Sequence, residues 1–230
     1  MSKFNLESEA ARLIILQRIE LATPFLKKIR KLFGRYIFSN YISKFFLDIK
    51  SIEEKYYSLM NSECELLENH ITFKNKKILS IGGGLGGLEL LINRKFNCPL
   101  SFIEKNYISK KVKYGWDNDN SEAYNDLKIL KNFLLNNHLN EEKFKIYDCD
   151  KDNLPEEKFD IIVSLYSLDY HYDFNIYSEY LKKVCHKETI LVFDTIKADL
   201  YKKVFNKVQI IKKDEQTVHK SKRIMCSNFI

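Results

Sequence analysis

The residues best suited to chemistry begin with a dense group of glycines. The chain has seven glycines in 230 residues, and five of them fall within positions 82–87, directly after the apolar run 78–81. The helix-forming segment Leu-Glu-Leu-Leu-Ile follows. A strand, a glycine loop and a helix in this order bring backbone amides close to a ligand and direct the helix N-terminus at it. The alternative is a tight turn without a ligand, which rarely needs five glycines. The expected ligand contacts in this loop are Gly82, Gly83, Gly84 and Gly86.

Acidic residues at the ends of two later apolar runs fit a nucleoside ligand. Glu104 ends the second run and lies twenty residues beyond Gly84. At that spacing a carboxylate can accept hydrogen bonds from both ribose hydroxyls of an adenosine. Asp148 and Asp150 follow the third run, where an acid can accept from an adenine amino group. The alternative for these two is loop capping, because Asp often bonds its own backbone. Asp150 is the preferred ligand of the pair.

The segment 164–174, which continues the fourth apolar run, carries candidates for acid–base catalysis. Ligands of parallel sheets bind beyond the carboxyl ends of the strands, so Ser164 is expected beside the cofactor. His171 is the candidate base for an alcohol acceptor, with Asp169 or Asp173 orienting it. The alternative is a packed histidine between two tyrosines. Substrate contacts are expected from four aromatic residues, for which core packing is the commoner role: Tyr114, Trp116, Tyr170 and Tyr172.

A parallel sheet would position these groups. From residue 77 onward, apolar runs alternate with helical segments, which is typical of a sheet with helices on its faces. A closing antiparallel pair is expected at the C-terminal end. The expected strands are 77–81, 100–103, 145–147, 160–165, 189–193, 207–213 and 217–226, with helices near 121–138, 175–186 and 199–204.

The segment 5–70 is helical in character and forms a predicted N-terminal cap. Thr23-Pro24 predicts the start of a second helix, which Gly34 can end. Ser51 and Glu54 predict a capping box for a third helix. We therefore expect a helical cap over residues 1–72 and a catalytic domain over 73–230, with a homodimer through the cap as one possibility.

Composition narrows the functional classes. The chain is 45% hydrophobic and 13% aromatic, which is enough for a sizeable core. It has no apolar stretch long enough for a membrane span and no signal-peptide pattern, so a cytoplasmic protein is expected. The net charge of +7 lacks a nucleic-acid motif and favours a solvated surface or a phosphorylated substrate. Five scattered cysteines predict reduced thiols, and no metal site is indicated.

Together these motifs resemble the class I S-adenosylmethionine-dependent methyltransferases. The resemblance covers about residues 75–230 and depends on Ile-Leu-Ser-Ile-Gly-Gly-Gly-Leu-Gly-Gly, Phe102-Ile103-Glu104, the Asp after the third strand and the run 159–164. It implies a Rossmann-like, mostly parallel seven-stranded sheet with an antiparallel last strand. It also implies a glycine loop along the methionine part of S-adenosylmethionine, an acid on the ribose, and S-adenosylhomocysteine as product. The family usually has an acid where this chain has Ser80, which puts a contact to the cofactor's amino group in doubt.

The segment after the fourth strand resembles a bacterial subgroup assigned to sugars or surface glycans. This implies O-methylation of a sugar, a glycan-linked acceptor or a phosphorylated small acceptor. Two alternatives remain. An NAD-dependent oxidoreductase would use the same loop, although residues 77–230 leave little room for a second catalytic domain. A non-catalytic protein could keep the fold as a binding or partner module.

Overall fold

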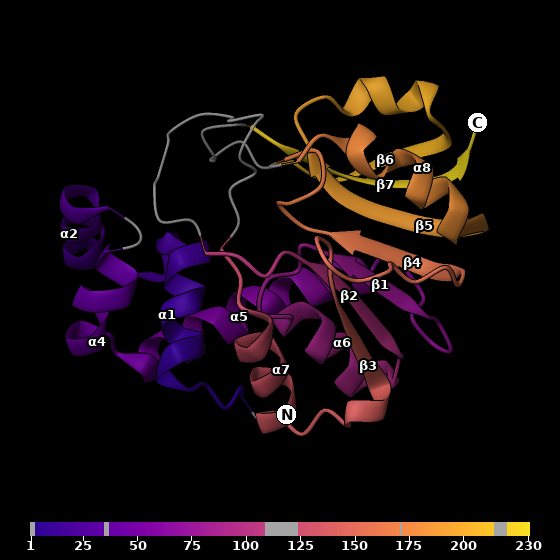
Figure 1. The fold of residues 1–230 in the computed structure, drawn as a ribbon. Coiled ribbons are helices and arrows are strands. Elements are labelled where there is room, and N and C mark those ends of the chain that lie inside the picture. Colours follow the sequence, from indigo (N-terminus) through magenta and orange to yellow (C-terminus); the bar gives the residue numbers. More distant parts are fainter. Residues whose placement is uncertain (1–2, 35–36, 109–123, 171, 214–219) are drawn as a thin grey trace.

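The computed structural model describes residues 3–34, 37–108, 124–170, 172–213 and 220–230. These residues form a seven-stranded sheet with the strand order β3-β2-β1-β4-β5-β7-β6 (Figure 1). Neighbours among β1 to β5 are parallel, whereas β7 is antiparallel to both β5 and β6. The predicted α/β fold is confirmed. The strands are β1 (Ile78–Ile81), β2 (Leu100–Glu104), β3 (Phe144–Asp148), β4 (Phe159–Ser164), β5 (Cys185–Thr195), β6 (Phe205–Lys213) and β7 (Lys222–Phe229).

Helices precede the sheet and connect its strands. The N-terminal ones are α1 (Ser8–Gln17), η1 (Ile19–Leu21), α2 (Pro24–Phe33), η2 (Phe38–Ile42), α4 (Ser43–Phe46) and α5 (Ile49–Glu68). The later ones are α6 (Gly87–Phe96), α7 (Leu127–Asn136), η3 (Glu141–Lys143), α8 (Phe174–Val184) and η4 (Ala198–Lys203). Within the described part of the chain, no helix combines the length and apolar character needed to cross a bilayer.

Local capping explains where the N-terminal helices begin and end. The Thr23 hydroxyl accepts a hydrogen bond from the Leu26 amide at 3.3 Å, and Gly34 ends α2 with a positive φ of 79°, as predicted. The expected capping box at Ser51 and Glu54 is wrong. Asp48 caps α5 instead, because its carboxylate accepts from the Ser51 amide at 3.0 Å.

Other predicted boundaries shift too, and the strand expected at 189–193 spans Cys185–Thr195. Ser121 lies outside the described residues, and α7 begins only after Asp126, whose carboxylate accepts from two amides of the first turn. The helix expected at 175–186 ends at Val184, because Cys185 already pairs with β4. The last strand runs to Phe229, three residues beyond its expected end.

Two apolar clusters cover the two faces of the sheet. One joins α1, α5, α6 and α7 to side chains of the sheet such as Phe102, and the other joins α8 and η4 to side chains such as Leu79 and Phe193. Figure 1 shows α8 on the opposite side of the sheet from α5 and α6. Helices α1 and α5 therefore share their core with the sheet.

A buried ion network fastens α5 to the last strands. Arg223 of β7 is fully buried and pairs with Glu63 of α5 and with Asp194 of β5, the latter at 3.1 Å. Lys212 of β6 also reaches Glu63, at 2.7 Å. Buried charges of this kind are tolerated only when they are paired. The network therefore fixes the helical segment against the sheet edge.

Candidate functional site

The glycine loop lies where the strand order reverses. β1 has β2 on one side and β4 on the other, and residues 82–86 connect β1 directly to α6. Open α/β sheets bind ligands at this switch point, beyond the carboxyl ends of the strands. Gly84 has a φ of +68°, and a Cβ there would come within 2.8 Å of the Gln17 Oε1 atom. A side chain at Gly84 would be strained by this φ, and its Cβ would displace the Gln17 amide.

Glu104 lies beside the loop at the end of β2, as the sequence predicts. Its side chain is 5% exposed. Oε1 accepts a hydrogen bond from the Gly84 amide at 3.0 Å, and Oε2 accepts from the Asn125 side chain at 2.9 Å. Burial raises the pKa of Glu104 to about 8, although both hydrogen bonds act in the opposite direction. The loop and this carboxylate form one site.

Two amide side chains that were not predicted as site residues cover this carboxylate and the loop. Asn125 donates to the Gly84 carbonyl at 3.1 Å as well as to Glu104. Gln17, the last residue of α1, donates to the Tyr124 carbonyl at 2.6 Å. Both amides can donate and accept, so they occupy positions suited to polar ligand atoms. No local motif identifies Gln17, because only the packing of α1 brings it to the loop.

A second buried carboxylate lies under the loop and was also missed. Glu89, in the first turn of α6, is 2% exposed, and its Oε1 accepts from the Ser80 hydroxyl at 2.6 Å. Its Oε2 has no hydrogen-bond partner among the described residues. A Cβ at Gly83 would meet Glu89 Oε1 at 2.8 Å, so the carboxyl lies against the loop backbone. Burial raises the pKa of Glu89, opposed mainly by the Ser80 hydrogen bond.

Glu89 lies next to Ser80, the position at which the resembled family usually has an acid. The strand itself carries no acid there, but the Glu89 carboxylate from the following helix accepts a hydrogen bond from the Ser80 hydroxyl. In sequence, Glu89 is a single acid within an apolar helical segment, which suggests a surface position. The helix instead turns it inward.

The other acids predicted to bind the cofactor have partners of their own. Asp148 is buried; its Oδ1 accepts from the Asp150 amide at 3.1 Å, and Oδ2 pairs with Lys151 at 3.3 Å. This is the loop-capping alternative named for these acids. Asp150 is exposed and faces Lys105 at 3.4 Å.

Ser164, also expected beside the cofactor, is buried at the end of β4. Its hydroxyl donates to the Ile81 carbonyl at 2.7 Å and accepts from the Leu168 amide at 2.9 Å. The hydroxyl therefore joins β1 to the turn that follows β4.

Of the catalytic candidates, Asp169 lies in that turn and Asp173 lies at the start of α8, whereas His171 lies outside the described residues. The Asp169 carboxylate accepts from the Thr195 hydroxyl and is also hydrogen-bonded to Tyr201. Asp173 caps α8 by accepting from the Asn175 amide at 2.8 Å. Both acids thus hold backbone or neighbouring hydroxyls in place.

The aromatic candidates are only partly described. Tyr114 and Trp116 lie outside the described residues. Tyr170 packs edge-on against Tyr166, with ring centroids 5.4 Å apart, and Tyr172 closes the turn through its carbonyl, which accepts from the Asp169 amide at 2.6 Å.

Tyr166 is a further residue at the strand ends that was not predicted. It adopts a φ of +56°, a conformation rare for a bulky residue. Arg18 and Arg223 lie over its ring, at 5.1 and 5.4 Å from the centroid. Its amide donates to Asp194 at 3.0 Å. Strain of this kind often occurs at functional sites.

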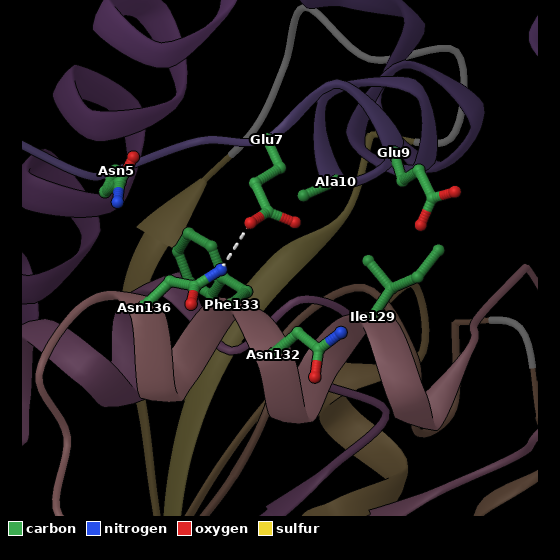
Figure 2. A pocket seen from close by; sticks show the side chains of 8 residues that line it. All are labelled: Asn5, Glu7, Glu9, Ala10, Ile129, Asn132, Phe133 and Asn136. Carbon is green, nitrogen blue, oxygen red and sulfur yellow. Dashed lines mark hydrogen bonds between the residues drawn. The ribbon is translucent and has the colours of Figure 1, made fainter.

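Two other features of the described residues have the makings of a ligand site, but neither fits one well. Asp148, Cys149 and Asp150 have potential metal-binding atoms within 4.8 Å of one another, but burial raises the pKa of the Cys149 thiol to about 11, which disfavours the thiolate a metal needs. A pocket between α1 and α7 has a volume of about 10 Å³, roughly one water molecule. Figure 2 shows the residues that line this pocket. Among them, the Asn136 side-chain amide donates a hydrogen bond to the Glu7 carboxylate, with 2.7 Å between nitrogen and oxygen. It includes no residue of the glycine loop.

Among known proteins, similarity to this chain is found in solved structures and not in family models or curated sequences. No family model matches the sequence, and no curated protein is significantly similar to it. A methyltransferase from Pyrococcus furiosus is 14% identical over 74% of this chain and 82% of that chain, with a TM-score of 0.47. Magnesium protoporphyrin IX methyltransferase from Synechocystis PCC 6803, solved with bound SAM, is 11% identical over 99% and 100%, with a TM-score of 0.45.

A further matched structure is an S-adenosylmethionine-dependent methyltransferase from Mesorhizobium loti. It is 17% identical over 57% of this chain, with a TM-score of 0.39, and this chain spans about half of its length (51%). In two other matched structures the chain covers 49% and 38% of their length. At such identities and TM-scores these similarities assign no cofactor or substrate to this chain.

Proposed function

We propose that this chain is an S-adenosylmethionine-dependent methyltransferase. The observation that carries the proposal is the pair of buried carboxylates on the two sides of one glycine loop. Glu104 contacts the Gly84 amide, and Glu89 lies against Gly83 with one oxygen unpartnered among the described residues. S-adenosylmethionine offers a ribose diol and an α-ammonium group, which suit a carboxylate at each end.

In this proposal the chain's own residues bind and orient the cofactor. Glu104 accepts hydrogen bonds from the ribose hydroxyls, and the loop from Gly82 to Gly86 lies along the methionine part. Glu89 pairs with the ammonium group and so replaces the acid missing at Ser80. Gln17 and Asn125, which now cover the loop and Glu104, must exchange their present hydrogen bonds for ligand contacts. The cofactor supplies an activated methyl group on its sulfonium.

The proposed acceptor is an alcohol of a sugar, of a glycan-linked molecule or of a phosphorylated small molecule. His171 takes the proton as the new bond forms, a role that typically contributes about 10²–10⁴-fold. Asp169, two residues earlier in the chain, orients this histidine in the proposal, and its carboxylate is hydrogen-bonded to Thr195 and Tyr201. Tyr170, Tyr172, Tyr114 and Trp116 are the proposed acceptor contacts.

Calorimetric titration with S-adenosylmethionine, S-adenosylhomocysteine and NAD tests the cofactor. We expect the first two to bind and NAD not to bind. Glu104→Gln should weaken S-adenosylhomocysteine binding roughly 10- to 100-fold, because the ribose hydroxyls lose a carboxyl oxygen as hydrogen-bond acceptor. Glu141→Gln, at an exposed ion pair with Lys131, is the matched control and should leave binding unchanged. Binding of NAD alone would replace the proposal with an oxidoreductase.

A ligand pair isolates the role of Glu89. S-adenosylhomocysteine carries the amino acid end, whereas 5′-methylthioadenosine lacks it. Glu89→Gln should weaken the first roughly 10- to 100-fold and leave the second within twofold. Adding Ser80→Asp to this variant should restore part of the loss by returning a carboxylate to the neighbouring position. Equal losses for both ligands would show a general defect of the pocket instead.

Turnover tests the base and the acceptor class. With a panel of sugars and phosphosugars as acceptors, His171→Ala should reduce turnover by roughly 10²–10⁴-fold while S-adenosylhomocysteine affinity stays the same. A loss of less than twofold contradicts the role of His171. Cofactor binding without transfer to any acceptor favours a non-catalytic binding protein.

A further inference from the structure

Helices α2, η2 and α4 expose large apolar side chains to solvent. Of the thirteen large hydrophobic residues exposed in the described part of the chain, seven lie between positions 25 and 46. We call these seven the apolar face. They are Phe25, Leu32, Phe33, Ile37, Tyr41, Phe45 and Phe46, with Leu32 at 77% and Phe45 at 82% exposure. Single exposed apolar residues are normal in proteins, but a group of this size marks an interaction surface.

The spacing shows that this face is ordered along the helices. On α2, Phe25 is followed by Leu32 and Phe33 at i+7 and i+8, and half-buried Ile29 completes the stripe at i+4. Only Leu26 of α2 is buried against the protein. Ile37 just before η2, Tyr41 in η2 and Phe45 in α4 recur at intervals of four. An amphipathic helix normally turns such a stripe toward the core.

The same segment is basic throughout. Between Glu20 and Asp48 there is no acidic residue. Exposed positive charges flank the apolar face, and Lys44 lies over the Tyr41 ring at 5.9 Å. The basic residues of the segment are Lys27, Lys28, Arg30, Lys31, Arg35 and Lys44.

We propose that the apolar face and its lysines bind the surface of an anionic lipid membrane. Aromatic and aliphatic side chains enter the boundary between headgroups and acyl chains, while lysines extend toward lipid phosphates. With ten residues, α2 is about 15 Å long, so it lies on the bilayer and does not span it. Figure 1 shows α2 and α4 at the edge of the molecule farthest from β5, β6 and β7.

The positive charge around the apolar face favours an anionic membrane over a second copy of the chain or nucleic acid as its partner. A second copy of the chain would bring an equally basic segment against this one, with no acid between Glu20 and Asp48 to compensate. Nucleic acid would pair with the lysines but would leave phenylalanine and leucine side chains without a role. An anionic bilayer complements both the charge and the apolar side chains.

Vesicle co-sedimentation tests this with the full chain. We expect binding to vesicles of phosphatidylcholine mixed with phosphatidylglycerol and much weaker binding to phosphatidylcholine alone. A triple variant should reduce binding to the anionic vesicles roughly 100-fold. It combines Lys27→Gln, Lys28→Gln and Lys31→Gln. Leu32→Ser/Phe45→Ser should reduce it at least about tenfold. Ile176→Ser, at a residue of α8 that is 69% exposed, is the matched control and should bind as the parent does.

Three results would overturn the proposal. The first is no sedimentation with either kind of vesicle. The second is binding that Leu32→Ser/Phe45→Ser leaves unchanged. The third is a dimer in analytical ultracentrifugation that Leu32→Ser/Phe45→Ser dissociates, which would assign the face to a second copy. The lipid experiment needs no methyl donor, so its result is independent of the proposed reaction.

Discussion

The glycine loop and the α2–α4 segment depart from ordinary protein packing in opposite directions. Beside the loop, the carboxyls of Glu104 and Glu89 are buried. On α2 and α4, side chains such as Phe45 are exposed. Both departures disfavour the folded state, because polar carboxyl groups lose hydration at the loop and apolar side chains stay in contact with water on α2 and α4. Regions of this kind are where a binding partner is expected to make up the difference.

Helices α1 and α5 provide the ordinary case between these two extremes. Ile14 of α1 is fully buried, and the buried charge of Arg223 is paired with Glu63 and Asp194. Burial therefore does not by itself mark a functional group. What distinguishes Glu89 from Glu63 is the oxygen left without a partner among the described residues.

Breaking the paired charges should have the largest effect on stability. Arg223→Ala leaves Asp194 buried without its cation and leaves Glu63 with Lys212 alone, and we expect a loss of about 3–5 kcal/mol in the free energy of unfolding. Urea denaturation measures it. Lys202→Ala, at an exposed pair with Asp199, is the control and should change stability by less than about 1 kcal/mol. Similar losses for both variants would contradict the expected difference between a buried and an exposed ion pair.

Apolar truncations compare the packed helix with the exposed one. Ile14→Ala should destabilise the protein by about 2–5 kcal/mol, because it leaves a cavity in the shared core. Phe45→Ala, at an exposed position, should change the free energy of unfolding by less than about 0.5 kcal/mol. Denaturant titration of both variants checks this. A large loss for Phe45→Ala would mean that the apolar face is covered by protein in solution.

The pH dependence of stability tests the buried carboxylates. The pKa of Glu104 is about 8 in the folded protein, against an ordinary value of 4.5. Between these values the folded chain holds a proton that the unfolded chain has released, so stability falls as pH rises. For Glu104 we expect a loss of roughly 3 kcal/mol from pH 5 to pH 8. Glu89, with its raised pKa, adds to the loss in the same direction.

Thermal unfolding of the parent and of Glu104→Gln across this pH range measures the effect. Stability should fall less steeply with pH in the variant, because Glu104 no longer titrates. The slope of stability against pH is compared, and not stability itself, since glutamine cannot accept from both the Gly84 and Asn125 donors and so lowers stability at every pH. Equal slopes in parent and variant would contradict the buried state of Glu104.

The smallest expected effect concerns the cap of α2. Thr23→Ala removes the acceptor of the Leu26 amide and should destabilise by roughly 1 kcal/mol. Since only Leu26 of α2 is buried, the loss should appear as local fraying of α2 in amide hydrogen exchange. Ser51→Ala on α5 is the control, because Asp48 supplies that cap. Fraying of α5 in the control would restore the capping box predicted from the sequence.

Sequence patterns predicted those elements whose signals are local. Thr23-Pro24 and Gly34 mark the ends of α2 because a cap needs only adjacent residues. The prediction failed at Ser51, where an equally good acceptor lay three residues earlier. Strand ends predicted part of the site. Glu104, at the end of β2, does lie beside the glycine loop, whereas Asp148, at the end of β3, accepts a hydrogen bond from the Asp150 amide in its own turn. His171 as a base stays a prediction.

By itself, the sequence determined the sheet, the glycine loop after β1 and the acid at the end of β2, because strand periodicity and strand–turn–helix chemistry are encoded in neighbouring residues. Tertiary structure alone decided that Glu89 turns inward to Ser80 and that Gln17 of α1 reaches the loop. It also decided that the apolar stripe of α2 faces solvent. Each depends on how a helix is rotated against distant neighbours, and a helical sequence offers several faces without stating which of them will be covered.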